Sequence, residues 1–183
     1  MTKIDLSKYQ NTLSKSDQLK RLLWSVVWGL FARPFPRSTF RRWKLFLLTC
    51  FGAKLHPTAN VYSSVTVYAP WNLKMGENSC IAPEVDCYNV ATVTIEANVT
   101  VSQKSYLCTA SHDISLPNHP LITAPIIIKD QAWIGASVFI GMGVTIGQGA
   151  VVGASSSVFK NVDPWVIIGG NPAKFIKKRK INV

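Results

Sequence analysis

The sequence predicts an all-β solenoid, a parallel β-helix, that follows a helical N-terminal extension. A six-residue repeat, glycines at regular places within it and an uneven distribution of charge support this prediction. From residue 128 onward every sixth residue is a β-branched aliphatic, and glycine follows four of them. A period of six belongs neither to an α-helix nor to an alternating β-strand. The repeated positions are Ile128, Ile134, Ile140, Ile146, Val152 and Val158.

The repeat is too regular to arise by chance. Ile and Val together account for 33 of 183 residues, so six consecutive matches at one phase have a probability of roughly 3 in 100,000. The period fits a short strand followed by a tight turn, with the aliphatic side chain pointing inward and glycine allowing close approach at a corner. Three such hexapeptides per coil give a triangular cross-section with an aliphatic interior.

The same period is present earlier in the chain. It starts at Leu55 and changes phase by two residues on the way to Ile81 and again before Ile95, so we expect small irregularities between coils. The chain therefore divides into a helical extension (residues 1–54), the solenoid (residues 55–173) and a basic tail (residues 174–183).

Charge divides the chain in the same way. Residues 1–54 carry 11 basic and 2 acidic side chains, residues 55–173 carry 4 basic and 7 acidic ones, and residues 174–183 carry 5 basic ones and no acidic one. A nucleic-acid-binding domain spreads Lys and Arg over its reading surface, and the middle region does not. We therefore expect no nucleic-acid partner, despite the net charge of +11.

The sequence of the N-terminal extension predicts two helices over residues 14–52, interrupted at residues 33–36. Ser16 and Asp17 are expected to cap the first helix. The apolar run over residues 22–31 is about half the length needed to cross a bilayer. Two interpretations remain open: a helical cap that seals the end of the solenoid, and an amphipathic anchor attracted to anionic lipid.

Cysteine and histidine usage indicates a reduced, metal-free protein. The four cysteines form no CxxC pair, and the polar first fifteen residues do not form a secretory signal, so a cytoplasmic location is expected. The three histidines, His56, His112 and His119, do not have the spacing of zinc ligands.

His112 stands where the repeat breaks. Residues 113–125 contain three prolines and abandon the hexad until Ile126 resumes it. A loop that leaves a rigid solenoid directly beside a histidine is typical of the wall or lid of a pocket. His119 lies within that loop, where we expect a structural role more than a contact with substrate.

Two segments carry a resemblance to known sequences. Residues 107–113 (Leu-Cys-Thr-Ala-Ser-His-Asp) resemble the segment with the catalytic histidine in galactoside, maltose and nodulation acetyltransferases. Residues 133–162 and the Gly-Gly-Asn-Pro-Ala-Lys run at residues 169–174 resemble the acyl-CoA-binding and terminal segments of that group. The chain is thus similar to the hexapeptide-repeat acyltransferases, nearest to the branch of colanic-acid and exopolysaccharide acetyltransferases. The helical extension does not resemble the N-terminal domain of maltose acetyltransferases.

The resemblance implies a left-handed β-helix that works as a homotrimer, with the active site between subunits. It implies His112 as the catalytic base. Asp86 and Asn89 stand just before the coil that leads to His112, so they are candidates for hydrogen bonds to the sugar, with solvent-facing polar groups of a turn as the open alternative. The expected contacts with acyl-CoA are small residues after repeat glycines, an aromatic residue, and lysines that could meet phosphates. They are Ala136, Ala154, Phe159, Lys160, Lys174 and Lys177.

The resulting prediction is direct acetyl transfer from acetyl-CoA to a hydroxyl of a sugar or glycan in surface-polysaccharide synthesis. A thioester carbonyl is already activated, so one general base, His112, is enough. N-acetylation of an amino sugar or small amine is an alternative on the same scaffold. A non-catalytic scaffold or membrane-docking module is another.

Overall fold

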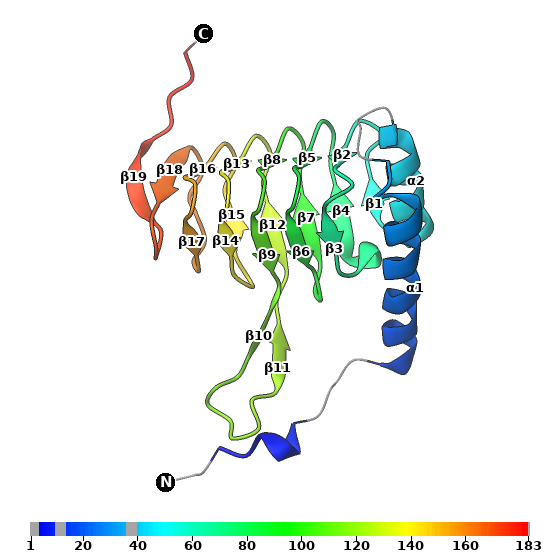
Figure 1. The fold of residues 1–183 in the computed structure, drawn as a ribbon. Coiled ribbons are helices and arrows are strands. Elements are labelled where there is room, and N and C mark those ends of the chain that lie inside the picture. The colour runs from blue at the N-terminus through cyan, green and yellow to red at the C-terminus, as the bar shows by residue number, and fades with distance from the viewer. Residues whose placement is uncertain (1–3, 10–13, 36–39, 183) are drawn as a thin grey trace.

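The computed structural model describes residues 4–9, 14–35 and 40–182. Its main body is a parallel β-solenoid of about six coils, in which three strand-bearing faces enclose one core (Figure 1). Two helices lie across one end and an antiparallel strand pair closes the other. The predicted fold class is confirmed.

Each coil contributes one short strand to each face, and strands in successive coils pair in parallel. The first face contains β1 (Lys54–Leu55), β4 (Leu73–Met75), β7 (Val93–Ile95), β12 (Ile126–Ile128) and β15 (Thr145–Ile146). The second face contains β2 (Asn60–Val61), β5 (Cys80–Ile81), β8 (Thr100–Val101), β13 (Trp133–Ile134), β16 (Val151–Val152), β18 (Val166–Gly169) and β19 (Lys174–Lys178). The third face contains β3 (Thr66–Val67), β6 (Asp86–Tyr88), β9 (Tyr106–Cys108), β14 (Phe139–Ile140) and β17 (Ser157–Val158).

The phase shifts in the sequence correspond to a change in coil length. Lys54 pairs with Lys74, twenty residues later, whereas Ile127 pairs with Thr145, eighteen residues later. The two additional residues of the early coils lie in the corner that leads to the first face, where η3 (Pro70–Asn72) is one such corner. The expected irregularities between coils are therefore present, and the aliphatic column continues through them.

The core is the predicted column of aliphatic side chains. Ile128, Ile134, Ile140 and Ile146 are all fully buried. Successive turns stack so closely that some corners exclude any side chain: a Cβ on Gly147 would lie 2.5 Å from the backbone nitrogen of Pro164. The repeat glycines are therefore required here by close approach of backbone.

The helices α1 (Lys15–Phe31) and α2 (Arg41–Cys50) replace the missing neighbour of the first coil. Ser14 caps α1, because its Oγ accepts from the backbone N–H of Asp17 at 3.0 Å. The cap predicted at Ser16 and Asp17 is thus wrong by two residues: those residues already form the first turn. The helix ends before Pro34, as predicted, and Pro36 lies outside the described residues.

Tryptophan side chains join α1 to the solenoid. The buried indoles of Trp24 and Trp28 donate hydrogen bonds of 2.7 and 2.9 Å to the carbonyls of Val67 and Val65. These carbonyls belong to the first coil, which has no coil beyond it to receive its hydrogen bonds. The inner sides of the helices therefore form the end cap that a solenoid needs.

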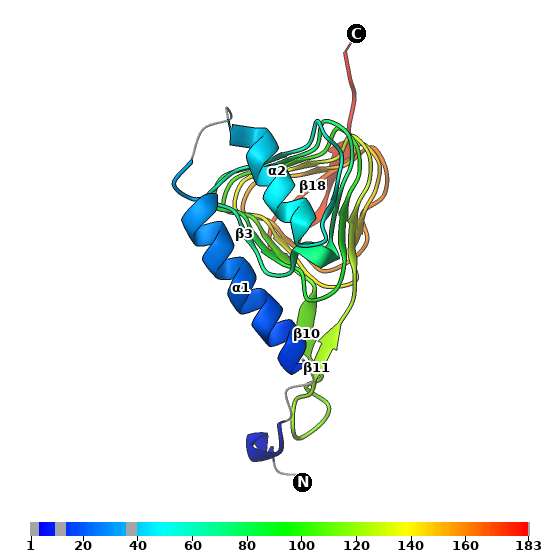
Figure 2. The same cartoon turned by 90° about the vertical axis from the view of Figure 1, so that its right-hand side faces the viewer.

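A β-hairpin leaves the solenoid after the third coil. Its strands β10 (Ala110–His112) and β11 (Leu121–Thr123) pair antiparallel and project from the body (Figures 1 and 2). The excursion predicted over residues 113–125 thus starts three residues earlier, because Ala110 to His112 already form a strand of the hairpin. The short helix η1 (Leu6–Lys8) lies beside the hairpin tip in both views.

The predicted basic tail closes the opposite end. Its first five residues form β19, which pairs antiparallel with β18. The guanidinium of Arg179 then donates to the carbonyls of Gln131 and Gly149 at 3.0 and 2.8 Å. This part of the tail is therefore ordered by backbone pairing.

Candidate active site

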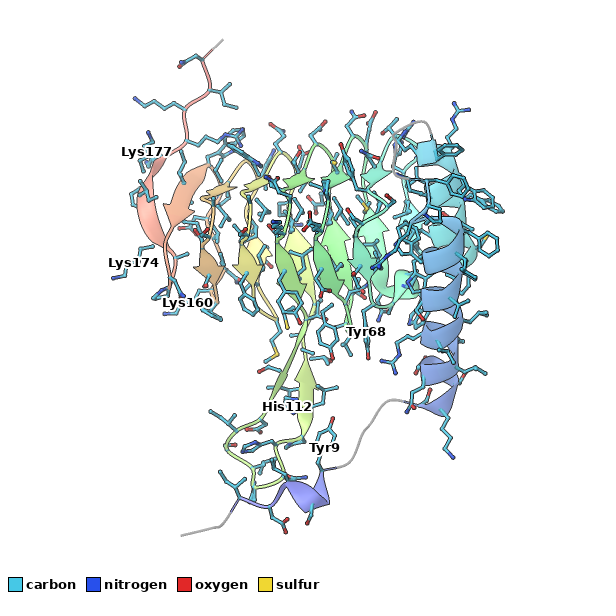
Figure 3. All side chains as sticks on the ribbon, in the orientation of Figure 1. Tyr9, Tyr68, His112, Lys160, Lys174 and Lys177 are labelled. Carbon is cyan, nitrogen blue, oxygen red and sulfur yellow. The ribbon has the colours of Figure 1, made fainter. Side chains whose placement is uncertain are left out.

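His112 ends β10, and its side chain is exposed on the hairpin (Figure 3). Its Nδ1 lies 2.7 Å from the carbonyl oxygen of His119. Because a carbonyl can only accept, Nδ1 carries a hydrogen, and in the neutral imidazole the lone pair is then on Nε2. Nε2 is therefore the atom that can take a proton from a substrate.

The hairpin loop holds this arrangement by its backbone. His119 has a φ of 42°, in the left-handed region, and the N–H of Asp113 donates to the carbonyl of Pro120 at 3.0 Å. The Asp113 carboxylate accepts from the N–H and Oγ of Ser115 at 2.9 and 2.6 Å. These bonds hold the pKa of Asp113 below its ordinary value. The His119 carbonyl thus orients His112, while Asp113 is occupied within the loop.

Thr109 anchors the base of the hairpin and was not singled out from the sequence. It is fully buried, and its Oγ1 donates to the carbonyl of Tyr88 at 2.9 Å while accepting from the N–H of Ala91 at 3.0 Å. Its own carbonyl accepts from the N–H of Ala124, where the chain returns from the hairpin, at 3.0 Å. Thr109 therefore fixes both ends of the hairpin to the preceding coil.

A hollow of about 500 Å³ lies next to His112. Leu6, Tyr9 and His119 are its other lining residues. The rings of Tyr9 and His112 are tilted, with centroids 5.9 Å apart. Leu6 and Tyr9 were not predicted, because more than a hundred residues separate them from His112 and no motif links the two segments.

Asp86 lies on the outer side of β6 and is not among the lining residues of the hollow at His112. It is in register with Thr66 and Tyr106 of the neighbouring strands, and burial raises the pKa of its carboxyl above the ordinary value. The side chain is exposed enough to meet a ligand. Its role as a sugar contact stays a prediction.

The structure does not place Asn89 where a sugar could contact it. The side chain is fully buried. Its Oδ1 accepts from the N–H of Ala69 at 2.9 Å and its Nδ2 donates to the Ala69 carbonyl at 2.6 Å. The prediction that Asn89 contacts the sugar is therefore corrected. Its side-chain amide instead connects two successive coils by hydrogen bonds inside a corner.

Two of the candidate acyl-CoA contacts lie in one corner between the second and third faces. The N–H of Ser155 donates to the carbonyl of Ala136 at 2.8 Å, which stacks the turn of Ala154 on that of Ala136. A Cβ on Gly135 would lie 2.7 Å from the backbone nitrogen of Ala154. The corner is therefore lined by small residues, which leaves its backbone accessible.

Three more candidates share a second hollow, of about 420 Å³, near the C-terminal end. Phe159, Lys160 and Lys174 are among its lining residues. Lys177 lies farther along β19 and points away from that hollow (Figure 3). The structure thus brings together the first three and separates Lys177 from them.

The candidate base, His112, and this second hollow lie apart in a single chain. His112 is on the projecting hairpin, whereas Lys160 and Lys174 are at the end of the solenoid (Figure 3). One chain therefore presents two separate halves of the predicted site.

Within residues 4–9, 14–35 and 40–182, no three His, Cys, Asp or Glu side chains lie close enough to share a metal ion. No helix within them is long and apolar enough to span a bilayer.

Comparison with known proteins agrees with the architecture. The chain is 40 % identical over 159 residues to WcaF of Escherichia coli K12, assigned as a colanic acid biosynthesis acetyltransferase, covering 87 % of this chain and 86 % of that one. A maltose O-acetyltransferase from Clostridium difficile 630 is 27 % identical, with a TM-score of 0.80 and coverage of 92 % and 90 %. A galactoside acetyltransferase bound to coenzyme A is 26 % identical, with a TM-score of 0.80 and coverage of 93 % and 86 %. No protein-family model matches the chain.

The fold and these relatives define a left-handed β-helical acyltransferase. The chain belongs to the hexapeptide-repeat acetyltransferases, so the predicted family is confirmed. Residues 55–183 are 129 of the 183 residues, too few for the 92 % covered by the maltose enzyme. The structural alignment with the maltose enzyme therefore extends into residues 1–54. The expected difference in sequence from the N-terminal domain of maltose acetyltransferases stays a prediction.

Proposed function

We propose that the protein transfers an acetyl group from acetyl-CoA to a hydroxyl of a sugar or glycan intermediate in surface-polysaccharide synthesis. The observation that carries this proposal is the bond between Nδ1 of His112 and the His119 carbonyl, which leaves Nε2 as a base beside a hollow. The sugar-modifying and CoA-bound relatives support the substrate classes.

The reaction needs one proton carrier. Nε2 of His112 takes the hydroxyl proton as the sugar oxygen attacks the thioester carbonyl. The resulting imidazolium keeps its Nδ1–H bond to the His119 carbonyl, which stabilises the positive charge. When the tetrahedral intermediate collapses, the C–S bond breaks and Nε2–H gives its proton to the departing thiolate. The products are an acetyl ester and CoA, with no acyl-enzyme.

Release of the CoA thiol tests this proposal. Wild type is measured with methyl glucoside, methyl galactoside, methyl fucoside and a set of sugar nucleotides, with glucosamine as the amino acceptor. We expect a hydroxyl acceptor to stimulate release and His112→Ala to lower it by about 100- to 10,000-fold. His56→Ala is the matched control, because it removes an exposed imidazole of the first coil that lines neither the hollow beside His112 nor the C-terminal one.

Each outcome discriminates between functions. Stimulation only by glucosamine would favour N-acetylation. Absence of stimulation by every acceptor, or full activity of His112→Ala, would favour a scaffold and overturn the proposal.

We further propose that the active site forms between subunits of a homotrimer. The separation of His112 from Lys160 and Lys174 in one chain supports this arrangement, because a neighbouring subunit can bring the second half of the site to the hairpin. Ala136, Ala154, Phe159, Lys160, Lys174 and Lys177 would then serve as the donor-binding side.

Mixed oligomers test the shared site. His112→Ala removes the base, and Ala154→Trp fills the small-residue corner. We expect each variant to be inactive alone and a co-expressed mixture to regain activity, because some sites then combine an intact hairpin with an intact corner. Sedimentation velocity measures the oligomeric state. A monomer, or a trimer whose mixture stays inactive, would contradict the shared site.

We also propose that the protein works in the cytoplasm and contacts the membrane through residues 14–52. The side of α1 opposite its buried tryptophans is apolar and exposed, so capping does not account for it. Its residues are Leu19, Leu22, Leu23, Val26 and Leu30, with exposed fractions between 48 % and 67 %. On α2, Trp43 and Phe46 stack at 5.7 Å and continue this apolar surface.

The charges around this surface suit anionic lipid. Lys15, Lys20, Arg33 and Arg42 are exposed on the same two helices and the turn between them, whereas Asp17 is the one acidic residue in the sequence from 14 to 52. Basic side chains flanking an apolar helix face favour the headgroup region of an anionic bilayer. The four free cysteines suit a reducing compartment.

Co-sedimentation with vesicles tests the membrane contact. We expect binding to phosphatidylcholine vesicles that contain phosphatidylglycerol and loss of it in a Leu23→Ser, Val26→Ser, Phe46→Ser variant. The matched control is Ile114→Ser, which changes an apolar side chain 82 % exposed on the hairpin. Equal binding by the triple variant and wild type would contradict the proposal, as would oligomerisation through this face in the absence of lipid.

A further inference from the structure

The hollow beside His112 is built from two segments that are distant in sequence. His112 and His119 come from the hairpin, while Leu6 and Tyr9 come from the first nine residues. Residues 4–9 lie beside the hairpin tip (Figures 1 and 2). They contribute two of the described residues that line the space next to His112.

Hydrogen bonds hold this segment in place. The backbone N–H of Asp5 donates to the carbonyl of Pro117 at the hairpin tip, at 3.0 Å. The Asp5 carboxylate accepts from the N–H and Oγ of Ser7 at 3.2 and 2.6 Å, and the N–H of Tyr9 donates to the carbonyl of Leu6 at 3.0 Å. The turn that carries Tyr9 is thus capped at one end and tethered to the hairpin.

The chemistry of the hollow differs from that of the C-terminal one. Among the side chains that the structure describes, its lining consists of an aliphatic, a phenol and two imidazoles, without a lysine or arginine. The C-terminal hollow has Lys160 and Lys174. A space with an aromatic ring and a hydroxyl suits a sugar, which has apolar C–H faces and hydrogen-bonding edges.

We propose that Tyr9 is an acceptor-binding residue: its ring lies against the sugar and its hydroxyl bonds to a sugar hydroxyl, with the N-terminal segment as one wall of the acceptor site. This inference rests on the proposed sugar acetyl transfer. The ring centroid of Tyr9, 5.9 Å from that of His112, places the sugar beside the base. Leu6 completes the apolar side of the wall.

Steady-state kinetics of Tyr9→Ala and Tyr9→Phe test the inference, with the methyl glycoside that stimulates wild-type CoA release as acceptor. We expect Tyr9→Ala to raise the KM for the glycoside about tenfold, the size of one lost aromatic contact, and to leave the KM for acetyl-CoA unchanged. Tyr9→Phe is expected to fall between Tyr9→Ala and wild type. Ile4→Ala is the matched control, because Ile4 is exposed in the same segment and does not line the hollow.

A second measurement reports binding without turnover. The glycoside should shift the His112 ring signals in histidine-labelled wild type and fail to do so in Tyr9→Ala at the same concentration. An unchanged KM for the glycoside in Tyr9→Ala, or an equal rise in both KM values, would overturn the inference. Neither result touches the proposed function, which fails instead if no acceptor stimulates the wild type.

Discussion

In the coils of the solenoid each interior strand pairs with a strand on either side, and the inward side chains are fully buried. In the hairpin, β10 and β11 pair only with each other among the described residues, and His112 is exposed. The coils thus concentrate the packing energy, while the hairpin carries the candidate base. Stability and catalysis are expected to be separable by mutation, because few contacts join the two regions.

The largest expected effect comes from removing the hairpin. Replacing residues 111–122 with Gly-Gly deletes His112 and His119 but leaves the coil pairing intact. We expect acetyl transfer to fall by about 100- to 10,000-fold, the contribution of a general base. The midpoint of thermal unfolding should move by only about 2 to 4 °C, since about 1 kcal/mol is at stake. A much larger loss of stability would show that the coils depend on the hairpin.

The converse change is Gly147→Val in a coil corner. The new side chain would clash with backbone atoms of Asp163 and Pro164 within 2.7 Å, so we expect the free energy of unfolding to fall by about 1 to 3 kcal/mol or more. Denaturant unfolding measures it. Activity per folded molecule should be retained. Gly29→Ala is the control: nothing lies within 4 Å of a Cβ there, and a helical Gly-to-Ala change should stabilise by up to about 1 kcal/mol.

The contact between cap and coil is expected to have a smaller effect. Trp28→Phe keeps an aromatic ring but removes the hydrogen bond to the Val65 carbonyl. Leaving that buried acceptor unpaired should cost about 1 to 3 kcal/mol of unfolding free energy, measured by denaturant titration. If the variant is as stable as wild type, the indole bond does not contribute to sealing the first coil.

The smallest effect is a change in the pH dependence of stability. Cys87 lies on β6 with its side chain in the core, and this burial raises the pKa of its thiol. Above the ordinary thiol pKa of 9.0, the unfolded chain loses this proton while the folded chain keeps it, so the free energy of unfolding falls as pH rises. One such group contributes a slope of at most about 1.4 kcal/mol per pH unit. Cys87→Val should flatten the decline between mildly and strongly alkaline pH, whereas Cys50→Ser should not.

The solenoid was predictable because its packing rule repeats. Each coil places the same residue type inward, so a β-branched aliphatic recurs at six consecutive repeat positions from Ile128 to Val158. The two-residue phase shifts predicted irregularities between coils, which the structure shows as two additional residues in the early coils. The position of His112 at a break was also readable, since a broken period marks an excursion of the chain.

The contacts around that histidine could not be predicted from the sequence, because they join segments that are distant in the chain and follow no repeat. Leu6 and Tyr9 reach the hairpin from the start of the chain, and Asn89 turns into a corner instead of outward. A polar residue next to a motif has the same sequence signature in either orientation. Ser14 shows the local version of this difficulty: serines at two positions could cap α1, and the hydrogen bond to Asp17 selects the earlier one.

The bond between His112 and the His119 carbonyl has a consequence for how this enzyme can diverge. The orienting group is a backbone atom, so it is present whatever side chain occupies position 119. Selection can exchange that side chain for any residue that accepts a positive φ, such as glycine or asparagine. The orientation of this candidate base therefore depends on the backbone conformation of the loop and not on the identity of a neighbouring side chain.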